Sequence, residues 1–178
     1  ANPYDLAIVQ DGRIFVVNRG AGGFSRVGIC NLEEEYLGEF GSYGDGDGQF
    51  KLPVAVAVDS KGRIYVADEY HHRISMFDTS GKFLGKWGVF GSESGRFNGP
   101  SGIVFDSEDN LYVVDQHNSR VQKFTCDGGF LSQWGEQGNA DGQFNMPWGI
   151  TIDAEGDVYV ADWRNDRIQK FSADGRFL

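Results

Sequence analysis

The strongest constraint on the fold of this chain is an internal repeat with a fixed step. Pro53, Pro100 and Pro147 are each separated by 47 residues. Other residues recur at the same spacing: Asp59, Asp106 and Asp153; Tyr65, Tyr112 and Tyr159; Arg73, Arg120 and Arg167; Phe77, Phe124 and Phe171. Because the units of such a repeat pack on their neighbours, we expect an array of similar modules.

The first copy of the repeat has diverged. Gly12 matches Gly62 at a step of 50, and the step returns to 47 from Arg26 onward, so three extra residues are expected between Asn18 and Arg26. We expect one domain over residues 1–178, with units at about 1–52, 53–99, 100–146 and 147–178, the last incomplete.

Each unit is predicted to hold four short strands. The first is an apolar, β-branched run such as 54–58 (VAVAV), which is too short for a helix. An acidic turn ending in Gly62 then predicts a hairpin. The second strand ends at Asp68, and the third begins at Arg73. After a fourth strand, a glycine-rich crossing leads to the next unit. This order predicts an all-β fold of four-stranded antiparallel propeller blades, with a solenoid of hairpins as the alternative.

The apolar residues of the first two strands are expected to form the core. They are Val56, Val58, Tyr65, Val66, Ile103, Phe105, Tyr112, Val113, Ile150, Ile152, Tyr159 and Val160.

Charge and hydropathy restrict the partners. The net charge of −10 opposes binding to nucleic acid or to an anionic membrane surface. No apolar run is long enough to cross a bilayer, so we expect a soluble chain without membrane contact. The sequence does not indicate a cellular compartment.

The motif residues of the last unit closely resemble the NHL repeat. They are Pro147-Trp148-Gly149-Ile150, Asp153, Gly156, 158–162 (VYVAD), Asn165, 167–171 (RIQKF), Gly175 and the crossing 138–144. The resemblance covers the whole chain, most strongly from Gly38 onward, and implies a six-bladed propeller of which about four blades are present. Members include the C-terminal domains of tripartite-motif ubiquitin ligases, some of which bind RNA, and a peptidyl-hydroxyglycine amidating lyase. The motif therefore specifies a fold and not a function.

Residues that recur in every unit are expected to have a structural role, and the function is expected where the units differ. Asp115 and Arg120 should pair across the loop between the second and third strands, as should their counterparts. The loops themselves read EYHH (69–72), QHNS (116–119) and WRND (163–166). In a propeller they emerge with the crossings on one side, which we call the loop face. There we predict a ligand-binding surface, with solvated turn residues as the alternative, made of Arg19, Phe24, Tyr70, His71, His72, Gln116, His117, Asn118, Trp148, Trp163 and Arg164.

The loop of the first unit is predicted to be long and flexible. Seven residues separate Asn18 from Arg26 where the other units have four, and Gly20, Ala21, Gly22 and Gly23 are among them. Such a loop can lie close to a bound group; drift in a terminal repeat is the alternative explanation.

Metal binding has to be considered because all three histidines lie in these loops. By the resemblance, His72 occupies the position of a metal-binding histidine in the amidating lyase. Ser119 and Asp166 occupy that position in the next two units, so the three-histidine arrangement is not reproduced. The acidic crossing at 45–48 (DGDG) lacks the bidentate glutamate of a calcium loop. We predict no metal, no cofactor and no catalytic residue.

Three functions are compatible with these observations. We favour a non-catalytic binding module that presents the loop face to a protein, a peptide or a small polar ligand. The alternative is a metal-dependent enzyme of the lyase or lactonase type whose remaining ligands lie in missing blades. An RNA-binding domain of a tripartite-motif-like ubiquitin ligase is opposed by the charge. Unpaired blade edges also predict association through those edges, or completion by the rest of a longer chain.

Overall fold

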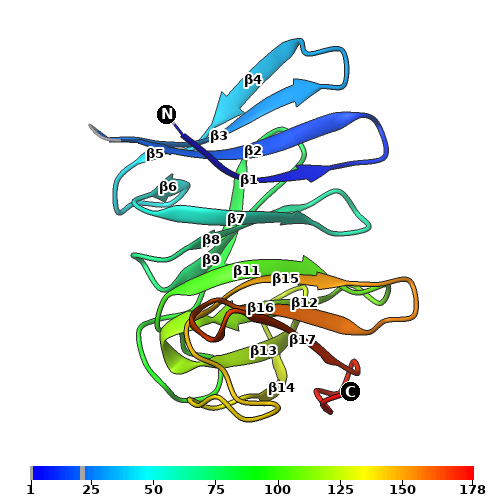
Figure 1. Cartoon of the computed structure of the whole chain (residues 1–178). Coiled ribbons are helices and arrows are strands. Elements are labelled where there is room, and N and C mark those ends of the chain that lie inside the picture. Colours follow the sequence, from blue (N-terminus) through cyan, green and yellow to red (C-terminus); the bar gives the residue numbers. More distant parts are fainter. Residues whose placement is uncertain (1, 21–22) are drawn as a thin grey trace. The chain divides into compact units, whose positions relative to one another are not determined.

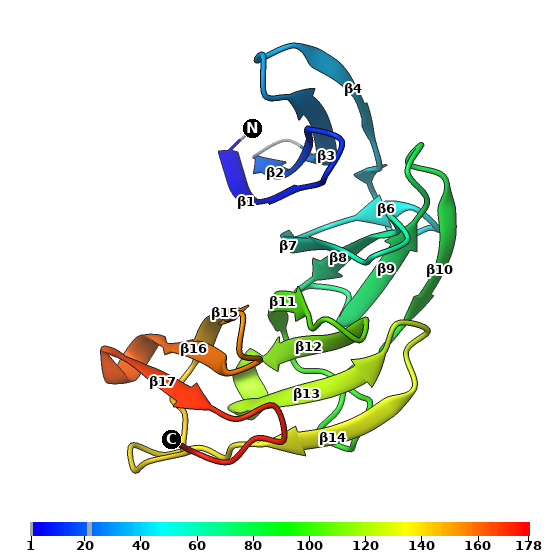
Figure 2. The ribbon, with the colours of Figure 1, turned by 90° about the vertical axis from the view of Figure 1, so that its right-hand side faces the viewer.

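The structure is a computed structural model that describes residues 2–20 and 23–178. It divides into two compact units, Ala1–Gly88 and Val89–Leu178, and each unit contains two antiparallel sheets. Figures 1 and 2 show the path of the chain through these sheets. The all-β prediction is confirmed, and each sheet is a propeller blade whose strands follow one another in sequence order.

The first unit holds blades one and two. Blade one consists of β1 (Asn2–Ile8), β2 (Arg13–Gly20), β3 (Phe24–Asn31) and β4 (Tyr36–Phe40). Blade two consists of β7 (Pro53–Val58), β8 (Ile64–Asp68), β9 (Arg73–Phe77) and β10 (Phe83–Trp87). The crossing between them forms a short parallel pair of β5 (Ser42–Tyr43) and β6 (Gln49–Phe50).

The second unit holds blades three and four. Blade three consists of β11 (Pro100–Phe105), β12 (Asn110–Asp115), β13 (Arg120–Thr125) and β14 (Phe130–Trp134). Blade four consists of β15 (Pro147–Ile152), β16 (Val158–Asp162) and β17 (Arg167–Phe171), and a bridge from Phe171 to Phe177 begins a fourth strand. The helices of the described chain are two single 3-10 turns, η1 (Gln116–Asn118) and η2 (Trp163–Asn165). No described helix has the length and apolar character that a membrane span requires.

The recurrent aspartate and tyrosine fix the first hairpin turn of blades two, three and four. In blade three, one carboxylate oxygen of Asp106 accepts hydrogen bonds from the backbone nitrogens of Glu108 (3.0 Å) and Asn110 (2.8 Å). The other oxygen accepts from the Tyr112 hydroxyl at 3.2 Å. The same contacts recur around Asp59 and Asp153. These side chains therefore satisfy turn amides that would otherwise lack a protein partner.

Each unit has its core between the facing sheets of its two blades. In the first unit Phe15, Val17 and Val27 of blade one pack against Val66 and Phe77 of blade two. In the second unit the two sheets enclose the fully buried Tyr112, Val114, Val121, Phe144, Val158 and Val160. A buried phenylalanine from each crossing packs on the last core phenylalanine of the third strand, with ring centroids 5.5 Å apart for Phe144 and Phe171.

The predicted core is confirmed in part. Val58, Phe105, Ile150, Ile152 and Tyr159 are half-buried rather than buried. In blade three, Tyr112 is buried because blade four covers its sheet. The outer face of blade four has no such cover among the described residues, and Ile168 is 72% exposed there although its counterpart Val121 is fully buried.

The loop of the first blade differs from the prediction. The ladder between β2 and β3 continues through the pairs Arg19 with Ser25 and Gly20 with Phe24. The extra residues therefore lengthen a hairpin, and the prediction of a seven-residue flexible loop is wrong in its extent. Ala21 and Gly22 lie outside the described residues.

One residue at the end of each later loop adopts left-handed backbone. The φ angles are 52° at His72, 53° at Ser119 and 50° at Asp166. After η1 and η2 the backbone nitrogen of this residue donates back to the first residue of the turn, at 3.1 Å and 3.3 Å. The chain reverses at this point and enters the third strand directly.

Candidate functional site

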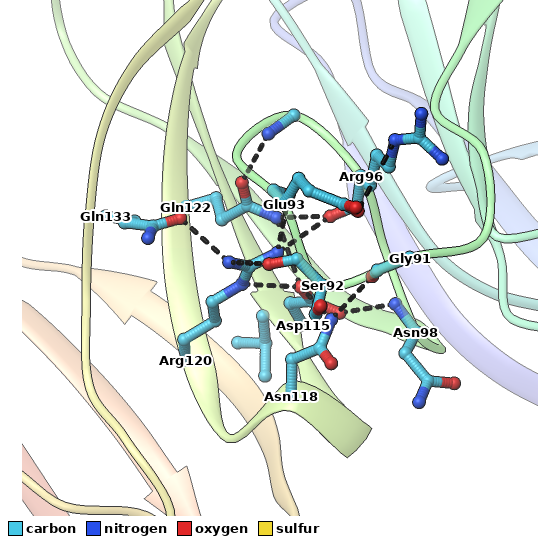
Figure 3. A network of polar contacts seen from close by, with 12 residues as sticks. Gly91, Ser92, Glu93, Arg96, Asn98, Asp115, Asn118, Arg120, Gln122 and Gln133 are labelled. Carbon is cyan, nitrogen blue, oxygen red and sulfur yellow. Dashed lines mark hydrogen bonds and ion pairs between the residues drawn. The ribbon is translucent and has the colours of Figure 1, made fainter.

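A buried network that we call the brace holds the loop of blade three in place (Figure 3). Its centre is Asp115, which is fully buried. One carboxylate oxygen accepts hydrogen bonds from Asn118 Nδ2 (2.8 Å), Arg120 Nε (2.8 Å) and Gln122 Nε2 (3.1 Å). The other accepts from the backbone nitrogen of Asn98 at 2.7 Å. The buried charge therefore has a guanidinium partner and several donors, as a buried carboxylate requires.

The brace also ties this loop to the crossing that precedes the blade. Arg120 donates to the carbonyls of Glu93 and Arg96, each at 3.0 Å, and Asn118 donates to the carbonyl of Gly91 at 2.9 Å. Blade four repeats the arrangement with Asp162, Asn165, Arg167 and Gln169. The predicted pairing of the recurrent aspartate and arginine is thus confirmed in these two blades, and Asn118 lies inside the brace with both amide hydrogens engaged.

Blade two departs from the brace, and the prediction that Asp68 pairs with Arg73 is wrong there. Asp68 instead accepts from Nδ1 of His71 at 2.7 Å, while Arg73 donates to the carbonyl of Gln49 at 2.7 Å. The buried Nε of Arg73 has no hydrogen-bond partner among the described residues. At the position of Gln122 this blade has Ser75, whose buried hydroxyl also lacks a described partner.

A charged cluster takes the place of the brace on the loop face of blade two. Nε2 of His71 lies 3.0 Å from Asp45, which also receives the Lys51 ammonium at 2.6 Å. Carboxylate oxygens therefore lie within hydrogen-bond distance of both ring nitrogens of His71. The Lys51 ammonium and then His71 lower the pKa of Asp45, and Asp45 in turn raises the pKa of Lys51. Tyr70 is 55% exposed, with the ammonium of Lys51 4.7 Å from its ring centroid.

Of the predicted residues of the first blade, Arg19 reaches the loop of blade two. The Arg19 guanidinium stacks on the Tyr4 ring at 3.7 Å and hydrogen-bonds the Tyr4 hydroxyl. It also lies 3.6 Å from the carboxylate of Glu69 in the loop of blade two. Phe24 is 53% exposed at the start of β3. The structure therefore brings Arg19 to the loop of Tyr70 and His71 within the first unit.

The predicted residues of the second unit have mixed environments. Gln116 is only 2% exposed, so its side chain does not contribute to the surface. His117 is exposed and packs over Gly99. Trp163 is 57% exposed, with the Arg164 guanidinium 5.6 Å from its ring centroid. Half-buried Trp148 accepts a hydrogen bond at its carbonyl from Ser101.

The described part of the chain contains no group of three or more histidine, cysteine, aspartate or glutamate side chains placed to hold a metal ion. His72 ends its loop in left-handed backbone.

Two clefts were not anticipated from the sequence. One, of about 460 Å³, lies between the first hairpin turns of blades one and two and is lined by Ile8, Val9, Gln10, Asp11 and residues 58–62. The other, of about 360 Å³, lies on the loop face of blade four and is lined by Gln137, Gly138, Asn139, Asn145 and Asn165. One lining position of the second cleft varies between blades: the equivalent positions 45, 92 and 139 carry Asp, Ser and Asn. This variation was visible in the sequence.

The four meander blades make this chain a β-propeller protein, and similar solved structures are β-propellers as well. The NHL repeat family model matches residues 50–77, 97–124 and 144–171. The chain therefore contains three NHL repeats.

Among curated proteins, the chain is similar to NHL repeat-containing protein 3 of Homo sapiens. The two are 35% identical over 79 residues, which cover 43% of this chain and 22% of that protein. This chain therefore aligns with less than a quarter of that relative.

Similarity to solved structures extends along almost the whole chain. A streptogramin B lyase matches with a TM-score of 0.74 and 17% identity over 99% of this chain and 53% of its own. A gluconolactonase from Xanthomonas campestris matches with a TM-score of 0.68 and 15% identity over 97% of this chain and 59% of its own. At these identities the comparison shows a shared fold.

Proposed function

We propose that this chain is a non-catalytic recognition module that binds a partner protein or peptide through the variable residues of its loop face. The proposal rests on the difference between recurrent residues of the blades that are buried and variable residues of the loops that are exposed. Recurrent residues such as Asp115 and Arg120 are buried and bonded to one another, whereas His117, Trp163 and Tyr70 change from blade to blade and are exposed. A constant frame with variable exposed aromatic and polar side chains is suited to recognition.

The character of the loop residues supports a protein or peptide partner. Exposed Trp and Tyr side chains offer large rigid contact areas, and they are enriched where proteins bind one another. The loop face of blade two adds the charges of Asp45, Lys51 and Glu69 to the ring of Tyr70. NHL propellers commonly mediate protein interactions, which agrees with this proposal.

The proposal can be tested by comparing two triple variants as baits in quantitative affinity capture. One replaces Tyr70, His117 and Trp163 with alanine on the loop face. The matched control replaces the exposed turn residues Lys61, Glu108 and Glu155 at the opposite ends of the strands. We expect a partner that binds the wild-type chain and the turn variant but not the loop variant. If the captured proteins are the same for all three baits, the proposal is refuted.

The enzymatic alternative concerns the kinds of activity named for two similar structures, a lyase and a gluconolactonase. It requires ligands for a metal, and the described side chains do not provide such a group. Elemental analysis of the purified chain distinguishes the two functions. One bound zinc or calcium ion per chain would favour the enzyme and contradict a purely non-catalytic role.

A further inference from the structure

The loop face of blade four carries a cleft whose lining is chemically uniform. Four of its five lining residues, Gln137, Asn139, Asn145 and Asn165, are carboxamides, and the fifth is Gly138. Its volume of about 360 Å³ falls within the range of small-ligand pockets, about 300–1,000 Å³. The lining contains no charged side chain and no aromatic ring.

The backbone around the cleft is held firmly. The backbone nitrogen of Asn145 donates to the buried Asp162 at 2.7 Å, and its carbonyl accepts from the backbone nitrogen of Arg164 at 3.1 Å. Gly138 donates to the carbonyl of Phe144 at 3.0 Å. Asn165 donates from its amide to Asp162 (2.8 Å) and to the carbonyl of Gly138 (2.9 Å). A backbone that is already held in place costs little conformational entropy when a ligand binds.

The polar groups of this lining remain available to a ligand. Both amide hydrogens of Asn165 are engaged, but its Oδ1 has no described donor. The side-chain amides of Gln137, Asn139 and Asn145 make no hydrogen bond to another described residue. Each of these three amides offers two donor hydrogens and an accepting oxygen within one small space.

The repeat shows that this lining is particular to blade four. The positions of Asn139, Asn145 and Asn165 are occupied in blade two by Asp45, Lys51 and His71. Lys51 and His71 both contact Asp45, so the polar groups of these three side chains are already engaged. In blade four the corresponding side chains are neutral amides; those of Asn139 and Asn145 make no hydrogen bond to another described residue, and Asn165 keeps its Oδ1 for a ligand.

Neutral amides select the chemistry of the ligand. An ionic ligand would lose its hydration without meeting a countercharge, and an apolar ligand would leave the amides unsatisfied. A hydroxyl group both donates and accepts, as a carboxamide does. Several hydroxyls around one compact ring match several amides around one compact cleft.

We propose that this cleft binds a neutral saccharide, with Gln137, Asn139 and Asn145 hydrogen-bonding its hydroxyl groups. Trp163, which is exposed, lies two residues before Asn165 in η2 and is not part of the lining. This proposal assigns a class of ligand to one part of the loop face, and it rests on the proposed function of that face in binding. A peptide is the other neutral ligand with mixed donors and acceptors, but it extends by about 3.3 Å per residue and presents few groups to a compact cleft.

The test is a titration of the ¹⁵N-labelled chain followed through its side-chain amide resonances. The probes are the methyl pyranosides of glucose, galactose, mannose and N-acetylglucosamine, with acetyl-trialanine amide as the peptide probe. We expect at least one saccharide to shift the resonances of Gln137, Asn139 and Asn145 in a saturable manner. The double variant Asn139→Ala/Asn145→Ala should weaken that binding at least tenfold. The control Ser92→Ala/Asn98→Ala alters the same positions in blade three and should leave the affinity unchanged.

The inference is overturned if none of the four saccharides shifts these resonances, if the double variant binds as tightly as the wild type, or if only the peptide probe binds. Unchanged thermal melting of both double variants confirms that the comparison concerns binding and not folding. Failure of saccharide binding while the loop-face triple variant still loses its protein partner would refute this inference alone. Failure of both experiments would refute the proposed function as well.

Discussion

Replacement of Asp115 by asparagine tests whether the brace stabilises the fold or merely accompanies it. The substitution keeps the size of the side chain and removes its charge. Arg120, which is 6% exposed, would then carry a buried positive charge whose Nε partner at 2.8 Å has become neutral. An amide at this position also places donor hydrogens among donors, because Asn98, Asn118 and Gln122 all donate to the present carboxylate.

The magnitude follows from the burial of both partners. Breaking a buried, hydrogen-bonded ion pair by neutralising one member costs about 3–5 kcal/mol. We therefore expect Asp115→Asn to lower the free energy of unfolding of the second unit by about that amount. The assay is urea denaturation followed by tryptophan fluorescence, which reports on this unit through Trp134, Trp148 and Trp163.

The control is Asp141→Asn in the same unit. Asp141 is exposed and lies 4.0 Å from Arg167, so its loss should cost at most about 1 kcal/mol. Equal midpoints and equal slopes for the two variants would show that the brace contributes no more than a surface ion pair, and the reasoning would be refuted.

Three further predictions concern packing, hydrogen bonding and pH. Gly102→Ala should lower the free energy of unfolding by about 1–3 kcal/mol, because a methyl group there would meet the backbone oxygen of Trp148 at 2.6 Å. An unchanged free energy of unfolding in the same denaturation assay would contradict this. Ser75→Gln supplies blade two with the side chain that completes the brace elsewhere and should raise stability by about 1 kcal/mol, measured by the same denaturation; a loss of stability would show that the site cannot accept it. Burial pushes the pKa of Asp106 upward, but its hydrogen bonds with Asn110 and Lys123 outweigh this effect and the net pKa is lowered. Its stabilising contribution is therefore present above the unfolded pKa of about 3.9 and is lost as the pH falls through the lowered folded value. Between pH 5 and pH 2 the melting temperature of the wild type should fall further than that of Asp106→Asn, and parallel decreases would contradict the assignment.

The sequence predicted those parts of the fold that repeat. Asp106 and Tyr112 recur at a fixed step because blades two, three and four have the same hairpin turn, and Arg120 has a counterpart in blade four because these two blades use the same brace. Equivalent positions of the repeat units can be compared within one chain, so the structural role of a recurrent residue can be inferred without any other protein.

The parts that were missed depend on contacts across strands and between blades. Tyr112 and Tyr159 are equivalent in sequence, yet only Tyr112 is buried, because burial depends on the neighbouring sheet. Arg19 pairs with Ser25 because the ladder between β2 and β3 extends into the segment whose glycine-rich composition predicted a loop.

The candidate site was predicted less well, because exposure and bonding at a loop position depend on its partners. Gln116 and His117 are adjacent in sequence, but the first is buried and the second is exposed. Asn118 was predicted to be part of a ligand-binding surface, and both hydrogens of its side-chain amide are engaged, by Asp115 and by the carbonyl of Gly91. Asn139 and Asn145 of the crossing differ from their counterparts Asp45 and Lys51 in blade two, but the sequence does not indicate that they line a cleft.

The left-handed residue at the end of each later loop has a consequence for protein engineering. Ser119 and Asp166 close their loops at nearly the same backbone angles, and both loops start from a buried aspartate and end at an arginine. The segments 116–119 and 163–166 therefore behave as exchangeable cassettes with matching ends. Each carries an asparagine at its third position, so the bond to the buried aspartate would survive the exchange. Randomising the second position, where His117 and Arg164 are exposed, should produce a library of new surfaces on an unaltered frame.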